Sequence, residues 1–260
     1  MLGPAPPEVQ SARVDRQAYA EMYEQEDVHW WFRGRRRVIW ALLGHADLPA
    51  APRLLDAGCG TGRNLVEFGV LGRASGVDPS ADAVAYCHER GLDDVREAGL
   101  ESLPFDDKTF DLLFACDVIE HVADDAAALA ELRRVASDRA HLVVTVPAYQ
   151  WLWTDHDVQL HHLRRYSRVE LLQRVTRAGW DPLVATSFNT LLLPVVAAAR
   201  VVSRYLARPG RTDLDRTPAH LNRALEIPMA LEASAIARGA CLPAGVSIGL
   251  LCAAADSRRS

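Results

Sequence analysis

The stretch "LLDAGCGTGRN", residues 54–64, decides the fold class. An apolar run ends in Gly58, Gly60 and Gly62, and a helical pattern begins directly after them. Glycine adopts left-handed backbone conformations without strain, and a glycine-rich turn that opens a helix points backbone N–H groups beyond the strand. We therefore expect a strand, a turn and a helix N-terminus that face a ligand. A turn that uses glycine for steric reasons alone is the alternative.

Apolar runs alternate with helical patterns along most of the chain. We expect strands at 53–58, 74–78, 94–98, 110–116, 140–147, 182–189 and 245–254. We expect helices at 63–71, 80–90, 124–136 and 168–178. Such alternation predicts right-handed βαβ units and a parallel sheet that is covered on both faces. The predicted class is α/β, with a doubly wound, mostly parallel, seven-stranded sheet.

Three parts are expected along the chain. Residues 1–48 form an N-terminal arm and a helical cap, in which apolar and aromatic residues recur at helical spacing from Tyr19 to Leu43. Residues 49–190 and 241–260 form the α/β core. Residues 191–240 form a helical insertion before the last strand, with Thr217 and Pro218 suited to the N-cap and N1 positions of its second helix.

The first helix of the insertion has an apolar stripe and a row of arginines, Arg200, Arg204 and Arg208. A basic amphipathic helix suits an anionic membrane surface, a lid over a pocket or a homodimer contact. Apolar stripes usually pack within proteins, which favours the lid or the interface.

Composition excludes several classes. With 260 residues, 49% hydrophobic and 24% charged, the chain reads as an ordinary globular protein, and its net charge of -5 gives no reason to expect nucleic acid. Five cysteines without a C-x-x-C pair indicate reduced thiols. The start "MLGPAPPEVQ" lacks a secretory pattern, and no uncharged apolar run reaches the roughly 18 residues of a membrane span. These features predict a cytoplasmic protein.

A carboxylate ends the second expected strand. Asp78 ends that strand in "GVDPS", twenty residues after Gly58, where ribose hydroxyls can donate to it. A dinucleotide-binding dehydrogenase shares such an acidic residue but needs G-x-G-x-x-G. Arg63 and Leu65 occupy the two positions where its third glycine would fall, which argues against that class.

These segments, followed by "LESLPFDDKTFDLLFACDVIEHV" and "LVVTVP", resemble the class I S-adenosylmethionine-dependent methyltransferases. They are most similar to a bacterial small-molecule branch with a "WWFRGRR"-like segment near its start. The resemblance covers roughly residues 20 to 190. It implies a Rossmann-like fold, S-adenosylmethionine as cofactor, S-adenosylhomocysteine as product, and methylation of an oxygen or nitrogen of a small, fairly apolar molecule such as a secondary metabolite.

The resemblance also implies the cofactor contacts. It puts Gly58, Gly60 and Gly62 around the methionine end, Asp78 on the ribose, and Leu100 with Glu101 against the adenine. Many relatives carry an acidic residue where this chain has Gly99. Further expected cofactor contacts are Trp31, Arg33, Asp56, Asn64, Pro79 and Asp117.

Arg33 with Trp30 and Trp31 resembles a segment that closes over the cofactor. A guanidinium can pair with the methionine carboxylate, and an indole face attracts a sulfonium. In the alternative, the tryptophans anchor the first helix in the core and the arginines form its solvent-exposed face.

The acceptor should lie at the carboxyl ends of the fourth and fifth strands. After the fourth, Asp117-x-x-Glu120-His121 resembles in part the metal-binding Glu-x-x-Glu-His cluster of ubiquinone-pathway O-methyltransferases, with aspartate in first place. We predict no metal ion, and favour a bracing role for Glu120 and His121. The metal-assisted reaction stays an alternative function.

After the fifth strand, "DHDVQLHHLRRYS" (155–167) resembles the "HD…H-x-RRYS" segment of the same branch, with His161 outside the match. Its histidine spacing fits no metal-ligand template. A neutral imidazole can accept a proton, so His156, His162 and His121 are the predicted catalytic residues. The predicted substrate contacts are Trp153, Arg165 and Tyr166. In the structural alternative, Arg164, Arg165 and Tyr166 dock the following helix.

A base would be helpful in this reaction but not obligatory. Alignment of the reactants can lower the activation barrier by about 7–11 kcal/mol, whereas a base typically raises the rate about 10²–10⁴-fold. An alternative from another class is a catalytically silent, cofactor-binding scaffold subunit.

Overall fold

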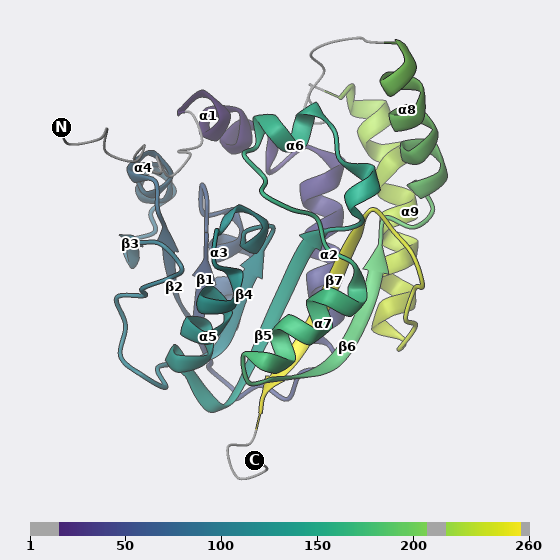
Figure 1. The fold of residues 1–260 in the computed structure, drawn as a ribbon. Coiled ribbons are helices and arrows are strands. Elements are labelled where there is room, and N and C mark those ends of the chain that lie inside the picture. The colour runs from purple at the N-terminus through teal and green to yellow at the C-terminus, as the bar shows by residue number, and fades with distance from the viewer. Residues whose placement is uncertain (1–15, 207–216, 256–260) are drawn as a thin grey trace, which may run out of the picture.

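The computed structural model describes residues 16–206 and 217–255, apart from the side chains at 156, 199 and 201–206. The expected arm at 1–13 and the side chains of Arg204, Arg208 and His156 lie outside this part. One seven-stranded sheet organises the described chain, with the strand order β3-β2-β1-β4-β5-β7-β6 (Figure 1). Its strands are β1 (Arg53–Ala57), β2 (Arg73–Asp78), β3 (Val95–Glu97), β4 (Phe110–Cys116), β5 (Ala136–Pro147), β6 (Trp180–Phe188) and β7 (Ser247–Ala254).

The pairing of the strands confirms the predicted fold class. β1 to β5 pair in parallel, and β7 runs antiparallel between β5 and β6. The carboxyl ends of β1, β2, β4 and β5 therefore meet at one edge of the sheet. At that edge lie α1 (Arg16–Gln25) and α6 (Asp155–Gln159), at the top of Figure 1.

Helices cover both faces of the sheet because the strand side chains alternate between two apolar layers. Leu54 and Leu112 pack with α2 (Trp30–Leu43), α3 (Arg63–Phe68) and α9 (Ala219–Ala237). Their neighbours Leu55 and Leu113 pack against α5 (Asp125–Val135) and α7 (Arg168–Arg177) on the opposite face. The remaining helix of the core, α4 (Ala81–Glu89), packs beside β2 and β3.

The helical stretch expected from Tyr19 to Leu43 is two helices. α1 ends at Gln25, and α2 begins at Trp30 with His29 as its N-cap, whose ring accepts a hydrogen bond from the backbone N–H of Trp31 at 3.3 Å. The break matters because it lays α1 across the end of the sheet.

Other expected boundaries differ in detail. β5 begins at Ala136, four residues before the expected start at 140, because the chain leaves α5 directly into the strand. The capping box of Ser167 and Glu170 at the start of α7 is confirmed. Between β4 and α7 the chain also forms three short helical turns that periodicity did not indicate, η2 (Ile119–His121), η3 (Gln150–Leu152) and α6.

The insertion between β6 and β7 forms α8 (Leu193–Leu206) and α9. The N-cap of α9 is Pro218, so the expectation of Thr217 at that position was wrong by one residue. Arg200 is 9% exposed and donates to the carbonyl of Leu152, so it does not belong to a solvated basic face. Within the described ranges, no helix combines the length and apolarity needed to span a bilayer.

Candidate active site

The glycine turn after β1 has the backbone that the sequence predicts. Gly58, Gly60 and Gly62 have φ angles of 77°, 53° and 84°, all in the left-handed region. A Cβ on Gly58 would lie 2.4 Å from Val118, and one on Gly62 would lie 2.6 Å from Leu92. Glycine is thus required here for conformation and for space, and the turn leads into α3 with Gly62 as its N-cap.

Asp78 is buried beside this turn at the end of β2. Its carboxylate accepts from the Gly60 N–H at 2.9 Å, the Ser80 N–H at 3.0 Å and the Tyr19 hydroxyl at 3.2 Å. Burial raises the pKa of Asp78, and these hydrogen bonds act in the opposite direction. The glycine turn and the carboxylate therefore form one unit, in which Pro79 follows directly after the acid.

Helix α1 covers this unit. Tyr19 reaches Asp78 from α1, and the sulfur of Met22 lies 3.3 Å from where a Cβ on Gly60 would stand. Just after α1, the buried Glu26 accepts hydrogen bonds from the Thr61 hydroxyl and from Arg90. The segment before α2 is thus fastened over the ends of β1 and β2.

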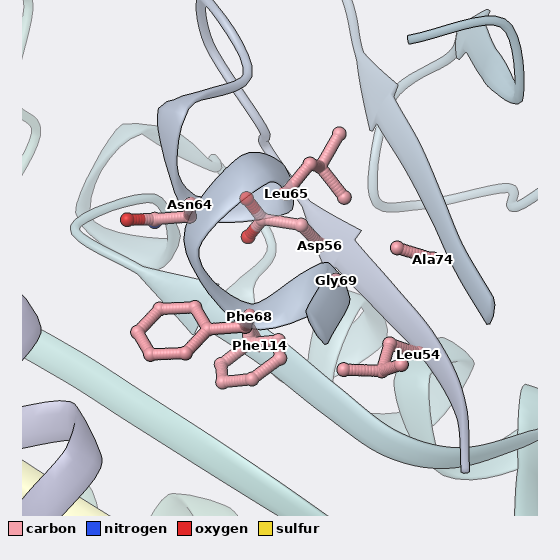
Figure 2. A pocket seen from close by; sticks show the side chains of 8 residues that line it. All are labelled: Leu54, Asp56, Asn64, Leu65, Phe68, Gly69, Ala74 and Phe114. Atoms are coloured by element: carbon pink, nitrogen blue, oxygen red, sulfur yellow. The ribbon is translucent and has the colours of Figure 1, made fainter. Parts of the chain in front are cut away.

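Asp56 is a buried carboxylate within β1. It is 1% exposed, neither oxygen has a hydrogen-bond partner, and burial raises its pKa to about 7. Figure 2 shows its side chain beside α3, whose Asn64 and Phe68 line the same pocket. The ring of Phe68 stacks on Phe114 at 4.9 Å beneath it, so the surroundings of Asp56 are largely apolar.

The start of α2 packs away from the glycine turn. Trp31 stacks on Phe188 of β6 at 5.8 Å, and the backbone N–H of Trp30 donates to Asn222 of α9. Arg33 pairs with Glu226 of α9 at 3.1 Å. Arg33 is therefore engaged by the insertion, which differs from the expected contact with a methionine carboxylate.

Arg35 is the arginine that lies at the strand ends, and the sequence reasoning missed it. Its guanidinium is 2.5 Å from the carboxylate of Asp117, while its Nε is buried without a hydrogen-bond partner. The available signal was spacing, because Arg35 stands four residues before Ile39 on the buried face of α2. Asp117 has a φ of 56°, and its N–H donates to Thr145 of β5.

The two residues expected against the adenine differ in exposure. Leu100 is 2% exposed and belongs to the core beneath α5, whereas Glu101 is exposed. The carboxylate of Glu101 lies 2.9 Å from where a Cβ on Gly99 would stand, so it occupies the space that the glycine leaves open.

On the expected acceptor side, η2 carries a second buried carboxylate. Glu120 is 0% exposed, neither of its oxygens has a partner, and burial together with the charge of Asp117 raises its pKa. The next residue, His121, places its ring 4.7 Å from that of His162. Burial and the neighbouring His162 lower the pKa of His121 to about 4, so its imidazole is neutral at pH 7.

Asp157 of α6 organises the segment 155–167. Its carboxylate is 2.8 Å from Nδ1 of His162 and accepts from Arg165 at 2.7 and 3.0 Å and from the Thr154 N–H at 2.8 Å. Burial acts to raise the pKa of Asp157, but the bonds from His162 and Arg165 hold it below its usual range. Sequence reasoning gave Asp157 no role, because its partners are set by the fold of this segment.

Most of the other residues of this segment make hydrogen bonds or ion pairs within the protein. Tyr166 is buried, and its hydroxyl donates to Asp125 at 2.7 Å and lies 3.2 Å from the carbonyl oxygen of Ile119. Arg164 pairs with the same aspartate at 3.1 Å. Trp153 is partly exposed. Tyr166 and Arg164 thus tie this segment to α5 and η2, whereas Arg165 pairs with Asp157 of α6.

Comparison with known proteins places this geometry in a family. A family model described as a methyltransferase domain matches residues 55–144. An uncharacterized methyltransferase of Bacillus subtilis is 30% identical over 225 residues, which cover 79% of this chain and 83% of that protein. A probable S-adenosylmethionine-dependent methyltransferase of Mycolicibacterium smegmatis is 30% identical over 157 residues. The chain belongs to the S-adenosylmethionine-dependent methyltransferases.

The coverage differs among these relatives. The match to the Mycolicibacterium smegmatis methyltransferase covers 59% of this chain and 60% of that protein. A solved structure of Haemonchus contortus phosphoethanolamine N-methyltransferase 2 superposes with a TM-score of 0.63 at 14% identity, over 98% of this chain and 62% of that one. This methyltransferase therefore shares the fold of that enzyme.

Proposed function

We propose that this methyltransferase moves the methyl group of S-adenosylmethionine to an oxygen or nitrogen of a small molecule and releases S-adenosylhomocysteine. The observation that carries the proposal is the unit formed by the left-handed glycine turn and Asp78 under α1. Such a unit at the carboxyl ends of parallel strands is where α/β proteins bind nucleotides.

The residues around this unit fit the cofactor. The Oδ1 of Asp78 is bound by the hydroxyl of Tyr19, which a ribose hydroxyl can replace as donor. Arg35 has a buried Nε with no partner, so its guanidinium has a donor left for the methionine carboxylate. We therefore assign that contact to Arg35 in place of Arg33. When bound, the cofactor supplies an electrophilic methyl group, and the protein aligns it.

The acceptor is proposed to lie between the ends of β4 and β5, beside η2 and the segment 155–167. Positioning supplies most of the acceleration in such a displacement, about 7–11 kcal/mol when the reactants are aligned. His156, His162 and His121 stay predictions as proton acceptors. A pKa of about 4 makes the imidazole of His121 a poor base at pH 7.

We also propose that the insertion acts as a lid on the acceptor side. Arg200 of α8 binds the carbonyl of Leu152 in η3, which links the insertion to the end of β5. The burial of Arg200 supports the lid over the membrane-surface alternative. A lid with an apolar stripe fits a fairly apolar acceptor.

Calorimetry with S-adenosylmethionine and S-adenosylhomocysteine tests the cofactor site. Asp78→Ala should lower the affinity at least tenfold, whereas Asp93→Ala, a change at an exposed aspartate, should leave it within twofold. An unchanged affinity in Asp78→Ala would remove the ribose assignment. Stabilisation by a nicotinamide cofactor without stabilisation by S-adenosylmethionine would favour the dehydrogenase alternative.

Transfer itself is tested with a radiolabelled methyl group. Wild-type protein incubated with labelled S-adenosylmethionine and a small-molecule cell extract should yield a labelled product, and Asp78→Ala should not. Tight cofactor binding without any labelled product would instead support the silent scaffold subunit.

A further inference from the structure

We propose that Glu120, His121 and His162 form a binding site for a divalent transition-metal ion such as Zn²⁺. The three side chains come from η2 and from the segment after α6, more than forty positions later in the sequence. Each offers one ligand atom, and these atoms lie within 4.8 Å of one another. The site does not rest on methyl transfer, because it concerns only these side chains and the ion.

Glu120 gives the first reason to place a cation here. Its side chain is fully buried, and both carboxylate oxygens lack a hydrogen-bond partner. A buried polar group without a partner costs about 1–3 kcal/mol even when neutral, and an isolated buried charge costs more. A bound cation would satisfy these oxygens and would explain why a carboxylate occupies this position.

The two imidazoles give the second, independent reason. Nδ1 of His162 is held by Asp157 at 2.8 Å. His162 therefore keeps its second nitrogen for another partner, and its ring lies 4.7 Å from that of His121. A histidine oriented by a carboxylate through one nitrogen, with the other on the metal, is the usual arrangement around metal ligands.

Asp157 is itself fixed, which makes the arrangement rigid. Arg165 binds its carboxylate through two nitrogens, and the Thr154 N–H donates to it as well. The orientation of His162 is therefore set before any ion binds. Preorganised ligands of this kind lose little freedom on binding, which favours affinity.

The donor set selects the class of ion. Two imidazole nitrogens and one carboxylate oxygen suit Zn²⁺, Fe²⁺ or Co²⁺, whereas Mg²⁺ and Ca²⁺ prefer oxygen ligands alone. Zn²⁺ bonds to such atoms span about 2.0–2.2 Å, so small side-chain rotations bring three atoms within 4.8 Å onto one ion. Three protein ligands leave one position open for water or for an oxygen of a bound molecule.

The proposed metal ligands differ from the Asp117-x-x-Glu120-His121 pattern in the sequence. Asp117 is engaged by Arg35 and lies outside the cluster, and His162 supplies the third ligand. The sequence did not indicate this set of ligands, because the ligand that completes it is distant in sequence.

The test uses untagged, full-length protein that has been stripped with a chelator. Calorimetry should show one equivalent of Zn²⁺ bound to the wild type and no binding of Mg²⁺. Co²⁺ should give visible d–d absorption bands, which report imidazole and carboxylate ligation independently of any activity. His162→Ala and Glu120→Gln should each lower Zn²⁺ affinity at least tenfold, the lower end of what even an outer-shell change produces.

His161→Asn is the matched control. His161 is exposed, lies beside His162 and has a φ of 57°, a conformation that asparagine tolerates. This variant should bind Zn²⁺ and Co²⁺ as the wild type does.

Two results would overturn the proposal. One is a wild-type protein that takes up no Zn²⁺ or Co²⁺, and the other is an affinity that is equal in the wild type, His162→Ala and Glu120→Gln. Binding of S-adenosylmethionine by each variant serves as the check on folding. A variant that keeps the cofactor and loses the ion supports the metal site, and a wild type that binds the cofactor without the ion rejects only the metal site.

Discussion

The proposed cofactor side and the proposed acceptor side lie at the carboxyl ends of different strands and are built in different ways. At the ends of β1 and β2, a single run from Gly58 to Gly62 is closed by backbone hydrogen bonds, and Asp78 joins it through the Gly60 N–H. At the ends of β4 and β5, the surface is assembled from side chains of separate segments, such as Tyr166 and Asp125, which are 41 positions apart.

This difference shows what holds each side in place. The glycine turn depends on backbone conformation, which three residues set locally. The acceptor side depends on buried charges that are stable only when each has its partner, as Asp157 has in Arg165 and His162. The stability of the glycine turn should therefore fall when a residue with a Cβ replaces a glycine. The stability of the acceptor side should fall when a single charged side chain is removed.

The largest loss of stability is expected from a substitution on the acceptor side. Asp157→Ala leaves the guanidinium of Arg165 buried without its partner, and breaking a buried pair in this way costs about 3–5 kcal/mol. Urea denaturation at pH 7 measures this loss. Asp138→Ala, which breaks the exposed pair with Lys108, should change the free energy of unfolding by less than about 0.5 kcal/mol. Equal effects in the two variants would contradict a central role for Asp157.

The same pair should also give a pH dependence. Because the pKa of Asp157 is lowered in the folded protein, its contribution to stability is present above the unfolded value of about 4 and is lost as pH falls below it. Asp157→Ala should therefore lose less stability on acidification than the wild type does. A steeper loss in the variant would contradict the assignment.

The next largest loss of stability is expected from a substitution in the glycine turn. Gly58→Ala combines a left-handed φ, at about 1–2 kcal/mol, with crowding against Val118, at about 1–3 kcal/mol. Gly91→Ala has nearly the same φ of 78° but open space around it, so it should show only the first contribution. Denaturation of both variants separates the two costs. If Gly91→Ala is as destabilising as Gly58→Ala, crowding at the turn plays no part.

The cofactor side and the sheet could be predicted because their determinants are local. A strand, three glycines and an acid at the end of the next strand specify the turn without help from the rest of the chain. The alternation of apolar runs likewise sufficed for seven strands, including the antiparallel β7.

The acceptor side could not be predicted in the same way. Periodicity indicated neither α6 nor η2, and sequence spacing does not show that Asp157 pairs with Arg165 or that His121 meets His162. On α2, the aromatic residues drew attention to Arg33, whereas the helical period places Arg35 on the buried face beside Asp117. Such contacts are set by how elements pack, which a single sequence does not state.

Arg35 and Arg33 offer the next test, on cofactor affinity. Arg35→Gln should weaken binding of S-adenosylmethionine about tenfold, or roughly 1.4 kcal/mol, because it removes a charged partner of the methionine carboxylate. Arg33→Gln, which breaks only the contact with Glu226, should stay within twofold. Calorimetry on both variants decides the matter. A larger loss in Arg33→Gln would restore the first expectation.

The smallest expected effect on cofactor affinity concerns the Tyr19 hydroxyl, which donates a hydrogen bond to Asp78. Tyr19→Phe removes one hydrogen bond to the carboxylate, which in the ligand-free protein stabilises by about 0.5–1.5 kcal/mol. If a ribose hydroxyl replaces that donor, the variant has no bond to give up when the cofactor binds. Its affinity for S-adenosylmethionine should then rise a few-fold while its free energy of unfolding falls slightly. Weaker binding in Tyr19→Phe would mean that the hydroxyl contacts the bound cofactor, and that α1 forms part of the site as well as its cover.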